Sequence, residues 1–142
     1  HLFAMDYLEL AFPRDICLHN QTGNSVLHIN TRSLNHKRDD VALFLEQFQL
    51  KFDLIMLTET WGTNDEPTFT LDGYNTFYLN RTHKRGGGVA LLVTTKKSCH
   101  IVPEFSKITD EYEILTVQFK DELISVIYRP PNGSMASFMQ FY

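Results

Sequence analysis

Short apolar runs alternate with polar connections along the chain, and one stretch has helical spacing. Residues 54–57 are continuously apolar, the composition of a strand buried on both faces. Residues 25–30 form a similar run that ends on the polar Asn30. Between these runs, from 39 to 52, apolar residues recur at the spacing of one helix face: Val41, Phe44, Leu45, Phe48 and Phe52. Strand, helix and strand in this order predict a right-handed crossover between two parallel strands.

The rest of the chain adds strands rather than helices. Strand composition recurs at residues 74–79, 89–93, 113–119 and 123–128. A polar turn at 120–122 separates the last two, which predicts a hairpin. Three glycines at 86–88 precede one strand without the Lys-Ser/Thr ending of a nucleotide-binding loop, so we interpret them as a backbone requirement for positive φ. The pattern predicts one α/β unit in which strands outnumber helices.

The organisation of the chain is that of one domain preceded by a short irregular segment. Residues 1–24 show no period and read as a leader or linker, whereas the globular pattern covers 25–142. The chain begins with His1, and its last residues are still apolar with no helix stop signal. We therefore expect a fragment of a longer protein.

Composition narrows the class of protein. With 142 residues, 43% of them hydrophobic and 13% aromatic, the chain can bury a core and is not of the disordered class. No apolar run approaches the ~20 residues that cross a bilayer, so no membrane partner is expected. Cys17 and Cys99 fit reduced thiols in an intracellular protein, and the histidines have no metal-ligand spacing.

Charge argues against a surface that binds nucleic acid everywhere, because the net charge is −4. A local basic cluster remains, formed by Arg81, His83, Lys84 and Arg85. Such clusters are usually solvated loops, and contact with a phosphate is the alternative interpretation.

Two polar residues mark the ends of the predicted parallel strands. Asn30 ends the first strand, and Glu59 lies just beyond the second. Parallel strands end at the same edge of a sheet, where α/β sheets bind ligands, so the two side chains should converge on one cleft. A carboxylate in that position needs a partner, unless it is simply a solvated residue at the end of a strand.

An ordered set of motifs then points to a family. The motifs are His-Ile-Asn-Thr-Arg-Ser-Leu-Asn at 28–35, Phe-Asp-Leu-Ile-Met-Leu-Thr-Glu-Thr-Trp at 52–61, Gly-Tyr-Asn at 73–75, Asn-Arg at 80–81, Gly-Gly-Gly-Val-Ala-Leu-Leu-Val at 86–93 and Ile-Tyr-Arg-Pro-Pro-Asn-Gly-Ser at 127–134. Over residues 25–142 the chain resembles the endonuclease/exonuclease/phosphatase superfamily. Within it, the chain is similar to the apurinic-type endonuclease domain of non-LTR (LINE-like) retrotransposons.

The resemblance implies both a fold and an activity. The fold would be a four-layer α/β/β/α sandwich, of which this chain would hold the N-terminal half in truncated form. The activity would be phosphodiester hydrolysis that depends on Mg²⁺, or on Mn²⁺ in its place, and that nicks one DNA strand. The nick would prime the reverse transcriptase of the same polyprotein. The partners would be DNA, the missing C-terminal half and that reverse transcriptase, and the location would be intracellular, in the nucleus when the protein acts on DNA.

The resemblance also assigns roles to individual residues. Asn30 matches the asparagine that orients the phosphate or the attacking water, Glu59 the metal-binding glutamate, and Tyr128 the tyrosine that contacts the scissile phosphate. Three further residues are candidates for binding the substrate: Arg32, Arg81 and Asn132. Arg32 stands where many members carry an acidic or amide residue near the metal. Since arginine cannot bind a cation, either the ligand set is reduced or Arg32 binds phosphate.

Motifs from the second half of the family are missing. That half supplies an aspartate–asparagine pair and a serine–aspartate–histidine motif, and no residue here matches them. We therefore expect this fragment to be inactive alone, with one face of the strands at 54–57 and 89–93 left uncovered. A non-catalytic relic or binding module is one alternative, and a phosphatase acting on phosphoinositides or other small phosphoesters is another. The Thr-Glu-Thr-Trp and Tyr-Arg-Pro-Pro-Asn stretches favour the retrotransposon endonuclease over the phosphatase.

Overall fold

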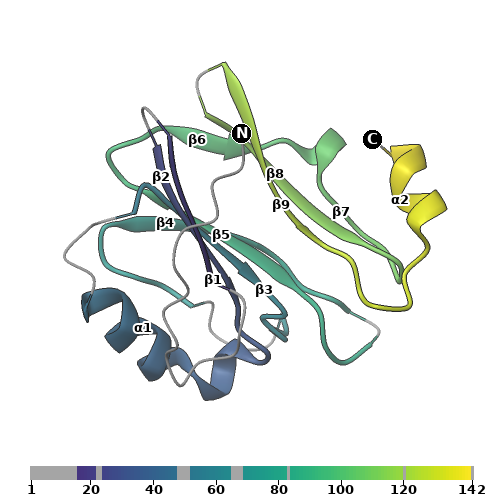
Figure 1. Cartoon of the computed structure of the whole chain (residues 1–142), viewed down its shortest axis with the longest axis horizontal. Coiled ribbons are helices and arrows are strands. Elements are labelled where there is room, and N and C mark those ends of the chain that lie inside the picture. Colours follow the sequence, from purple (N-terminus) through teal and green to yellow (C-terminus); the bar gives the residue numbers. More distant parts are fainter. Residues whose placement is uncertain are drawn as a thin grey trace.

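Two β-sheets form the centre of the molecule (Figure 1). The computed structural model describes residues 16–21, 24–47, 52–64, 69–82, 84–119 and 121–141. The first sheet has five strands in the order β1-β2-β3-β5-β4. Their bounds are β1 (Ile16–Gln21), β2 (Asn24–Asn30), β3 (Leu54–Thr58), β4 (Tyr74–Leu79) and β5 (Val89–Thr94).

The second sheet is built around one long strand. It has the order β6-β8-β7, and β9 pairs with β8 as an antiparallel hairpin. The bounds are β6 (Cys99–Ile101), β7 (Lys107–Ile108), β8 (Glu113–Phe119) and β9 (Glu122–Tyr128). The helical elements are the α-helices α1 (Arg38–Gln47) and α2 (Met135–Phe141), and the short 3-10 helices η1 (Leu34–His36) and η2 (Pro103–Phe105). The predicted strands and hairpin are therefore present.

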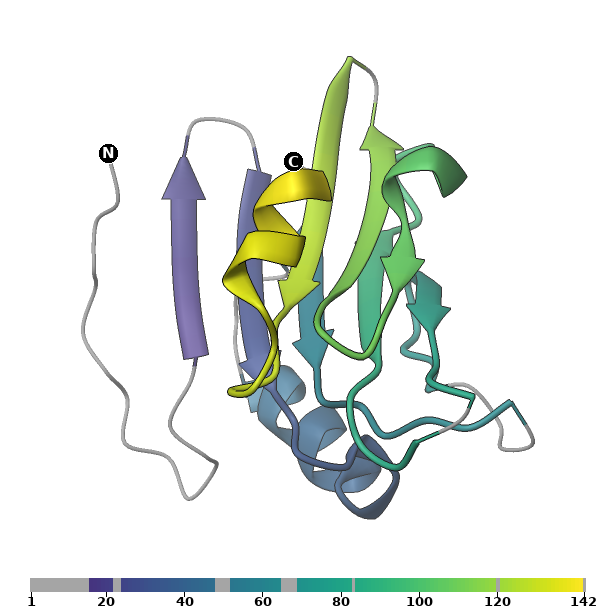
Figure 2. The same ribbon diagram turned by 90° about the vertical axis from the view of Figure 1, so that its right-hand side faces the viewer.

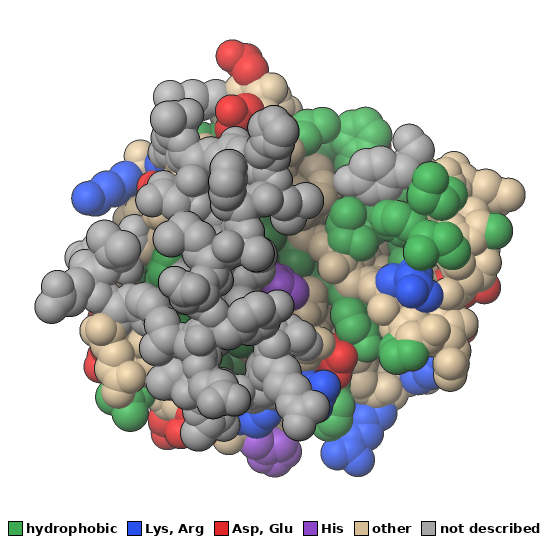
Figure 3. Space-filling model, in the orientation of Figure 1, with side chains coloured by type: hydrophobic (Ala, Val, Ile, Leu, Met, Phe, Trp, Pro, Cys, Tyr) green, Lys and Arg blue, Asp and Glu red, His purple; other side chains and the backbone are tan. Residues whose placement is uncertain are grey.

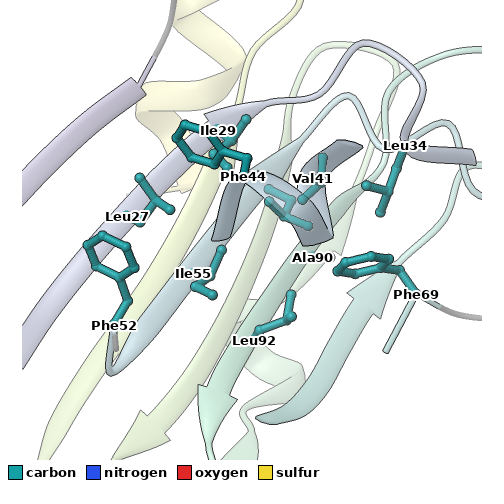
Figure 4. Close-up of a cluster of buried hydrophobic side chains, with 11 residues drawn as sticks. Leu27, Ile29, Leu34, Val41, Phe44, Phe52, Ile55, Phe69, Ala90 and Leu92 are labelled. Carbon is teal, nitrogen blue, oxygen red and sulfur yellow. The ribbon is translucent and has the colours of Figure 1, made fainter. Parts of the chain in front are cut away.

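The predicted crossover is also present. Strands β2 and β3 are parallel, and their register places Asn30 beside Thr58. The helix α1 connects them and buries Val41 and Phe44 against the sheet. Figure 4 shows these two side chains among the buried residues of β2, β3 and β5. The described helix covers Arg38–Gln47 of the predicted 39–52, Phe52 is not helical, and Phe48 lies outside the described residues.

The second sheet covers the face of the first that lies away from α1. Figures 1 and 2 show the β8–β9 hairpin lying across β3 and β5. The core between the sheets contains Leu54, Val89, Leu91, Val93, Leu115, Val117 and Val126. Fully burying one such aliphatic side chain contributes about 1.5–3 kcal/mol. The expectation that one face of strands 54–57 and 89–93 would be uncovered is therefore wrong, because the alternating side chains of β8 and β9 supply the missing layer.

The first sheet begins earlier than the sequence pattern indicated. Strand β1 lies within residues 1–24 and pairs antiparallel with β2, so the sheet starts before Ser25. At the other end of the described chain, α2 packs on Tyr112, whose ring centroid lies 5.9 Å from that of Phe138 and 5.7 Å from that of Phe141. None of the described helices is long and apolar enough to cross a membrane.

Candidate active site

Three of the predicted site residues meet at one end of the two sheets. Asn30 is the last residue of β2, Glu59 follows β3 directly, and Tyr128 is the last residue of β9. Asn30 Nδ2 donates to Glu59 Oε1 at 3.0 Å, and the hydroxyl of Tyr128 hydrogen bonds with the Glu59 carboxylate. The predicted convergence of Asn30 and Glu59 is confirmed.

The direction of the Glu59 side chain depends on its backbone. Along β3, Ile55 and Leu57 face the helix α1, while Met56 faces the second sheet. Strict alternation would send Glu59 toward the helix with Leu57. Instead its φ is 53°, in the left-handed region, and the carboxylate reaches Tyr128 on the second sheet. A break in the strand pattern therefore turns this carboxylate into the space between the sheets.

Neighbouring backbone holds this conformation. The carbonyl oxygen of Glu59 accepts hydrogen bonds from Thr31 Oγ1 at 3.1 Å and from the Ser33 N–H at 2.9 Å. Four non-glycine residues here have positive φ, namely Arg32, Ser33, Glu59 and Trp61. Each such residue costs roughly 1–2 kcal/mol. Strain of this kind persists only where surrounding contacts enforce it, and it is typical of ligand-binding sites.

A buried carboxylate next to the site was not predicted. Glu113, at the start of β8, is 0% exposed and lies opposite Tyr128 in the β8–β9 register. Its Oε1 lies 2.5 Å from Arg81 Nε, and its Oε2 accepts the Gly88 N–H at 2.7 Å. The sequence did carry a signal, because Glu113 has the same parity as the apolar Leu115 on its strand. An ionised carboxylate on the buried face of a strand is costly unless a cation or hydrogen-bond donors compensate it.

The glycines at 86–88 fit around this carboxylate. All three have positive φ, of 90°, 68° and 86° in order, which confirms the interpretation as a backbone requirement. A Cβ on Gly87 would overlap Glu113 Oε1 and lie 2.5 Å from Arg81 Nε. The turn can therefore approach the Arg81–Glu113 pair only without side chains.

The site favours a protonated tyrosine and one net negative charge. Burial, the hydrogen bond to Glu59 and the charges of Glu59 and Glu113 raise the pKa of Tyr128 to about 12, against the opposing charge of Arg81. Burial also raises the pKa of Glu113, although Arg81 and the Gly88 N–H oppose the shift. Because Arg81 compensates Glu113, the carboxylate of Glu59 is left facing Asn30 and Tyr128 as the excess charge.

The three candidates for substrate binding are placed differently. Arg81 is 6% exposed and forms the buried ion pair, so its guanidinium is committed to Glu113. Arg32 is exposed on the connection after β2, two positions beyond Asn30. Asn132 is exposed in the turn before α2.

The basic cluster at 81–85 is divided by the fold. Only Arg81 is buried, whereas Lys84 and Arg85 are exposed and His83 lies outside the described residues. The Arg85 guanidinium carbon lies 5.6 Å from the centroid of the Trp61 ring, within range of a cation–π contact. On the face that Figure 3 shows, Lys and Arg side chains of the described residues are scattered rather than gathered in one patch.

Two oxygen donors at the site suit a hard divalent cation. One is the Glu59 carboxylate. The other is Asn30 Oδ1, a buried atom that has no hydrogen-bond partner in the described part of the chain. No group of three or more His, Cys, Asp or Glu side chains that could hold a metal occurs among the described residues. Magnesium, however, commonly takes only one or two carboxylates and keeps several waters, so the donors present fit it.

Comparison with known proteins identifies the family of the chain. The model of the endonuclease/exonuclease/phosphatase family matches residues 26–141, and no curated protein sequence matches the chain. The chain belongs to the endonuclease/exonuclease/phosphatase family. Its two sheets are consistent with the fold of that family, and the family supports a nuclease or phosphatase-like function.

Proposed function

We propose that this chain is part of a divalent-metal-dependent DNA endonuclease encoded by a non-LTR retrotransposon. The observation that carries the proposal is the meeting of Asn30, Glu59 and Tyr128 at one end of the sheets. The stretches at 58–61 and 128–132, which resemble the retrotransposon branch, surround two of these residues. The product would be a nick in one DNA strand that primes the reverse transcriptase of the same polyprotein in the nucleus.

Each side chain has a distinct part in this proposal. Glu59 and Asn30 Oδ1 would hold Mg²⁺, or Mn²⁺ in its place, and the cation would neutralise charge on the phosphate. The amide of Asn30 would orient the phosphate or the attacking water. Tyr128 would donate a hydrogen bond from its hydroxyl to a phosphate oxygen as negative charge develops there. A pKa of about 12 keeps that proton in place at neutral pH.

Contact with the DNA backbone would come from exposed residues around the site. Arg32 is exposed close to Asn30, and arginine matches phosphate geometry with two donors. Asn132, exposed after β9, would be a further polar contact. With a net charge of −4, the chain would depend on such local contacts rather than on its overall field.

The proposed reaction needs a group that activates water and one that protonates the leaving oxygen. Such general acid–base help contributes roughly 10²–10⁴-fold. Glu59, Asn30 and Tyr128 supply a metal site and a hydrogen-bond donor, and the carboxylate of Glu113 is held by Arg81. We therefore propose that activity requires further residues of the same polyprotein, and that residues 1–142 are inactive alone.

The decisive experiment is nicking of supercoiled plasmid by the longest polypeptide that the reading frame encodes. We expect Mg²⁺-dependent nicking that Glu59→Gln abolishes, because the change removes the formal charge from the metal site. Asn30→Ala and Tyr128→Phe should slow the reaction by roughly 10²–10³-fold, the effect of losing one transition-state donor. Glu46→Gln, which changes an exposed carboxylate on α1, is the matched control.

Other outcomes identify the alternatives. Release of phosphate from a phosphoinositide, without nicking, would replace the endonuclease by the phosphatase. A folded protein that performs neither reaction but binds DNA or another ligand would favour the non-catalytic module.

A further inference from the structure

The buried pair of Arg81 and Glu113 touches the candidate site only indirectly. Neither residue belongs to the Asn30–Glu59–Tyr128 group, yet Glu113 is the most completely buried charge among the described residues, at 0% exposure. A buried ion pair is weak evidence for stability, because desolvation can exceed the attraction between the charges. The position of this pair needs another explanation.

Hydrogen bonds connect Glu113 to the backbone beside Glu59. Glu113 Oε2 accepts the Gly88 N–H at 2.7 Å. The carbonyl of Gly88 then accepts the Thr60 N–H at 3.2 Å, and that of Gly87 accepts the Trp61 N–H at 2.8 Å. The glycine turn is thus fixed on one side by Glu113 and on the other side fixes the two residues that follow Glu59.

The backbone of the same glycine turn packs too closely against Thr60 to accept a side chain at Gly88. Gly88 has a φ of 86°, and a Cβ there would lie 2.5 Å from Thr60 Oγ1. Glu59 itself has a left-handed φ of 53°, which local sequence does not favour. Contacts from outside must therefore maintain the backbone that turns the Glu59 carboxylate toward Asn30 and Tyr128.

We propose that Glu113, held in place by Arg81, is a positioning residue for Glu59. It acts through the Gly87–Gly88 turn and touches no substrate. The inference deepens the proposed function, since it concerns the carboxylate that would hold the metal. Its test measures the two side chains that contact Glu59 and needs no nuclease activity, so a failure here is distinguishable from a failure of the endonuclease proposal.

Two double variants of the full chain isolate the hydrogen bond to the turn. Arg81→Met with Glu113→Gln removes both charges but keeps an acceptor for the Gly88 N–H. Arg81→Met with Glu113→Leu removes both charges and the acceptor. The loss of formal charge near Tyr128 is the same in both, so Coulomb effects do not account for a difference between them.

The reporters are the side-chain amide signals of Asn30 in NMR spectra and the pKa of Tyr128. In the Gln-containing variant we expect the Asn30 signals to resemble the wild type and the pKa of Tyr128 to stay raised. In the Leu-containing variant we expect the Asn30 signals to shift and the pKa of Tyr128 to fall below that of the Gln-containing variant, because the contribution of Glu59 is lost while that of burial remains. Identical reporters in the two variants, both folded, would overturn the proposal.

A second pair of variants serves if the Leu-containing protein does not fold. Gly88→Ala pushes the turn against Thr60 while the ion pair remains, whereas Gly73→Ala has a similar φ of 84° and nothing within 4 Å of the added Cβ. We expect the reporters at Asn30 and Tyr128 to move in Gly88→Ala and not in Gly73→Ala. Equal responses to the two alanines, or no response to either, would refute the positioning role.

Discussion

Asn30 Nδ2 lies within hydrogen-bond distance of Glu59 Oε1, at 3.0 Å, although 29 positions separate the two residues in the chain. The contact follows from the parallel pairing of β2 and β3, which ends both strands at one edge. It leaves Asn30 Oδ1 buried without a partner among the described residues, next to a carboxylate. An acceptor of this kind beside a negative charge favours a cation over a further hydrogen-bond donor that carries no charge.

Divalent cation binding by the chain should therefore centre on Asn30 and Glu59. Paramagnetic Mn²⁺, added to the protein in NMR titrations, should broaden the signals of Asn30 and Tyr128 first. Glu59→Gln should remove this effect, and Asn30→Ala should weaken it, because each loses one oxygen donor. Asp110→Asn, at an exposed carboxylate, should leave it unchanged. First broadening at a different part of the molecule would contradict the assignment.

The hydroxyl of Tyr128 should lose its proton only at strongly alkaline pH. Its pKa is raised to about 12, first by burial and then by the hydrogen bond and charge of Glu59. Titration of tyrosinate absorbance should therefore show a high component that Tyr128→Phe removes and Glu59→Gln lowers. Tyr78→Phe, at an exposed position, should leave this component in place.

The raised pKa of Tyr128 also makes the stability of the fold depend on pH. Because the folded pKa of Tyr128 lies above its ordinary value of 10.0, its contribution is fully present below pH 10 and is lost as the pH rises through about 12. Urea unfolding of wild type and Tyr128→Phe across this range should show a loss specific to the wild type. Parallel pH profiles would contradict the Glu59–Tyr128 contact.

At the opposite edge of the first sheet, Asp53 should stabilise the start of β3. Its carboxylate accepts the Ser25 N–H at 2.9 Å and lies 3.1 Å from Lys97 Nζ. Burial opposes ionisation, but the hydrogen bonds from Ser25 and Lys97 and the charge of Lys97 outweigh it and lower the pKa of Asp53. Asp53→Asn should reduce the free energy of unfolding by about 1–2 kcal/mol.

The sign of this effect sets its pH range. A lowered pKa gives stability that is present above the ordinary aspartate value of 3.8 and is lost as the pH falls through the folded pKa. Thermal unfolding should show that Asp53→Asn loses stability at neutral pH and approaches the wild type in acid. Asp110→Asn is the matched control, because its pair with Lys84 is 3.9 Å long and exposed. A pair of that kind contributes about 0–1 kcal/mol.

The sequence predicted those parts of the site that follow from strand topology. An apolar run at 54–57 and a helix before it were enough to place Asn30 beside Glu59, because parallel strands end together. The turned carboxylate of Glu59 could not be predicted in the same way. Its left-handed φ depends on hydrogen bonds from Thr31 and Ser33, which a local pattern does not encode.

The position of the second sheet could not be predicted from the local sequence pattern either. The alternation of residues 113–119 indicated a strand, but not that it would cover β3 and β5, so the expected uncovered face was wrong. The role of Glu113 was not predicted, since its partner Arg81 is distant in the sequence and was assigned to the substrate. Pairing between two charges that are distant in the sequence leaves one local signal. The carboxylate occupies a strand position whose neighbours two residues away are apolar.

Removing only the cation of the Arg81–Glu113 pair should destabilise the protein in a pH-dependent way. Arg81→Met leaves a buried carboxylate uncompensated, which costs about 3–5 kcal/mol when it is ionised. Burial already raises the pKa of Glu113, and loss of Arg81 should raise it further. A raised pKa gives stability that is present below the ordinary glutamate value of 4.5 and is lost as the pH rises through the folded pKa. The loss in free energy of unfolding caused by Arg81→Met should therefore be large at neutral pH and small in acid, as measured by urea unfolding.

The double variant with Glu113→Gln, which carries no buried charge here, should recover much of the stability and lose this pH dependence. A deficit that is equal at every pH, or a double variant no more stable than Arg81→Met, would show that Glu113 is not the group that Arg81 compensates.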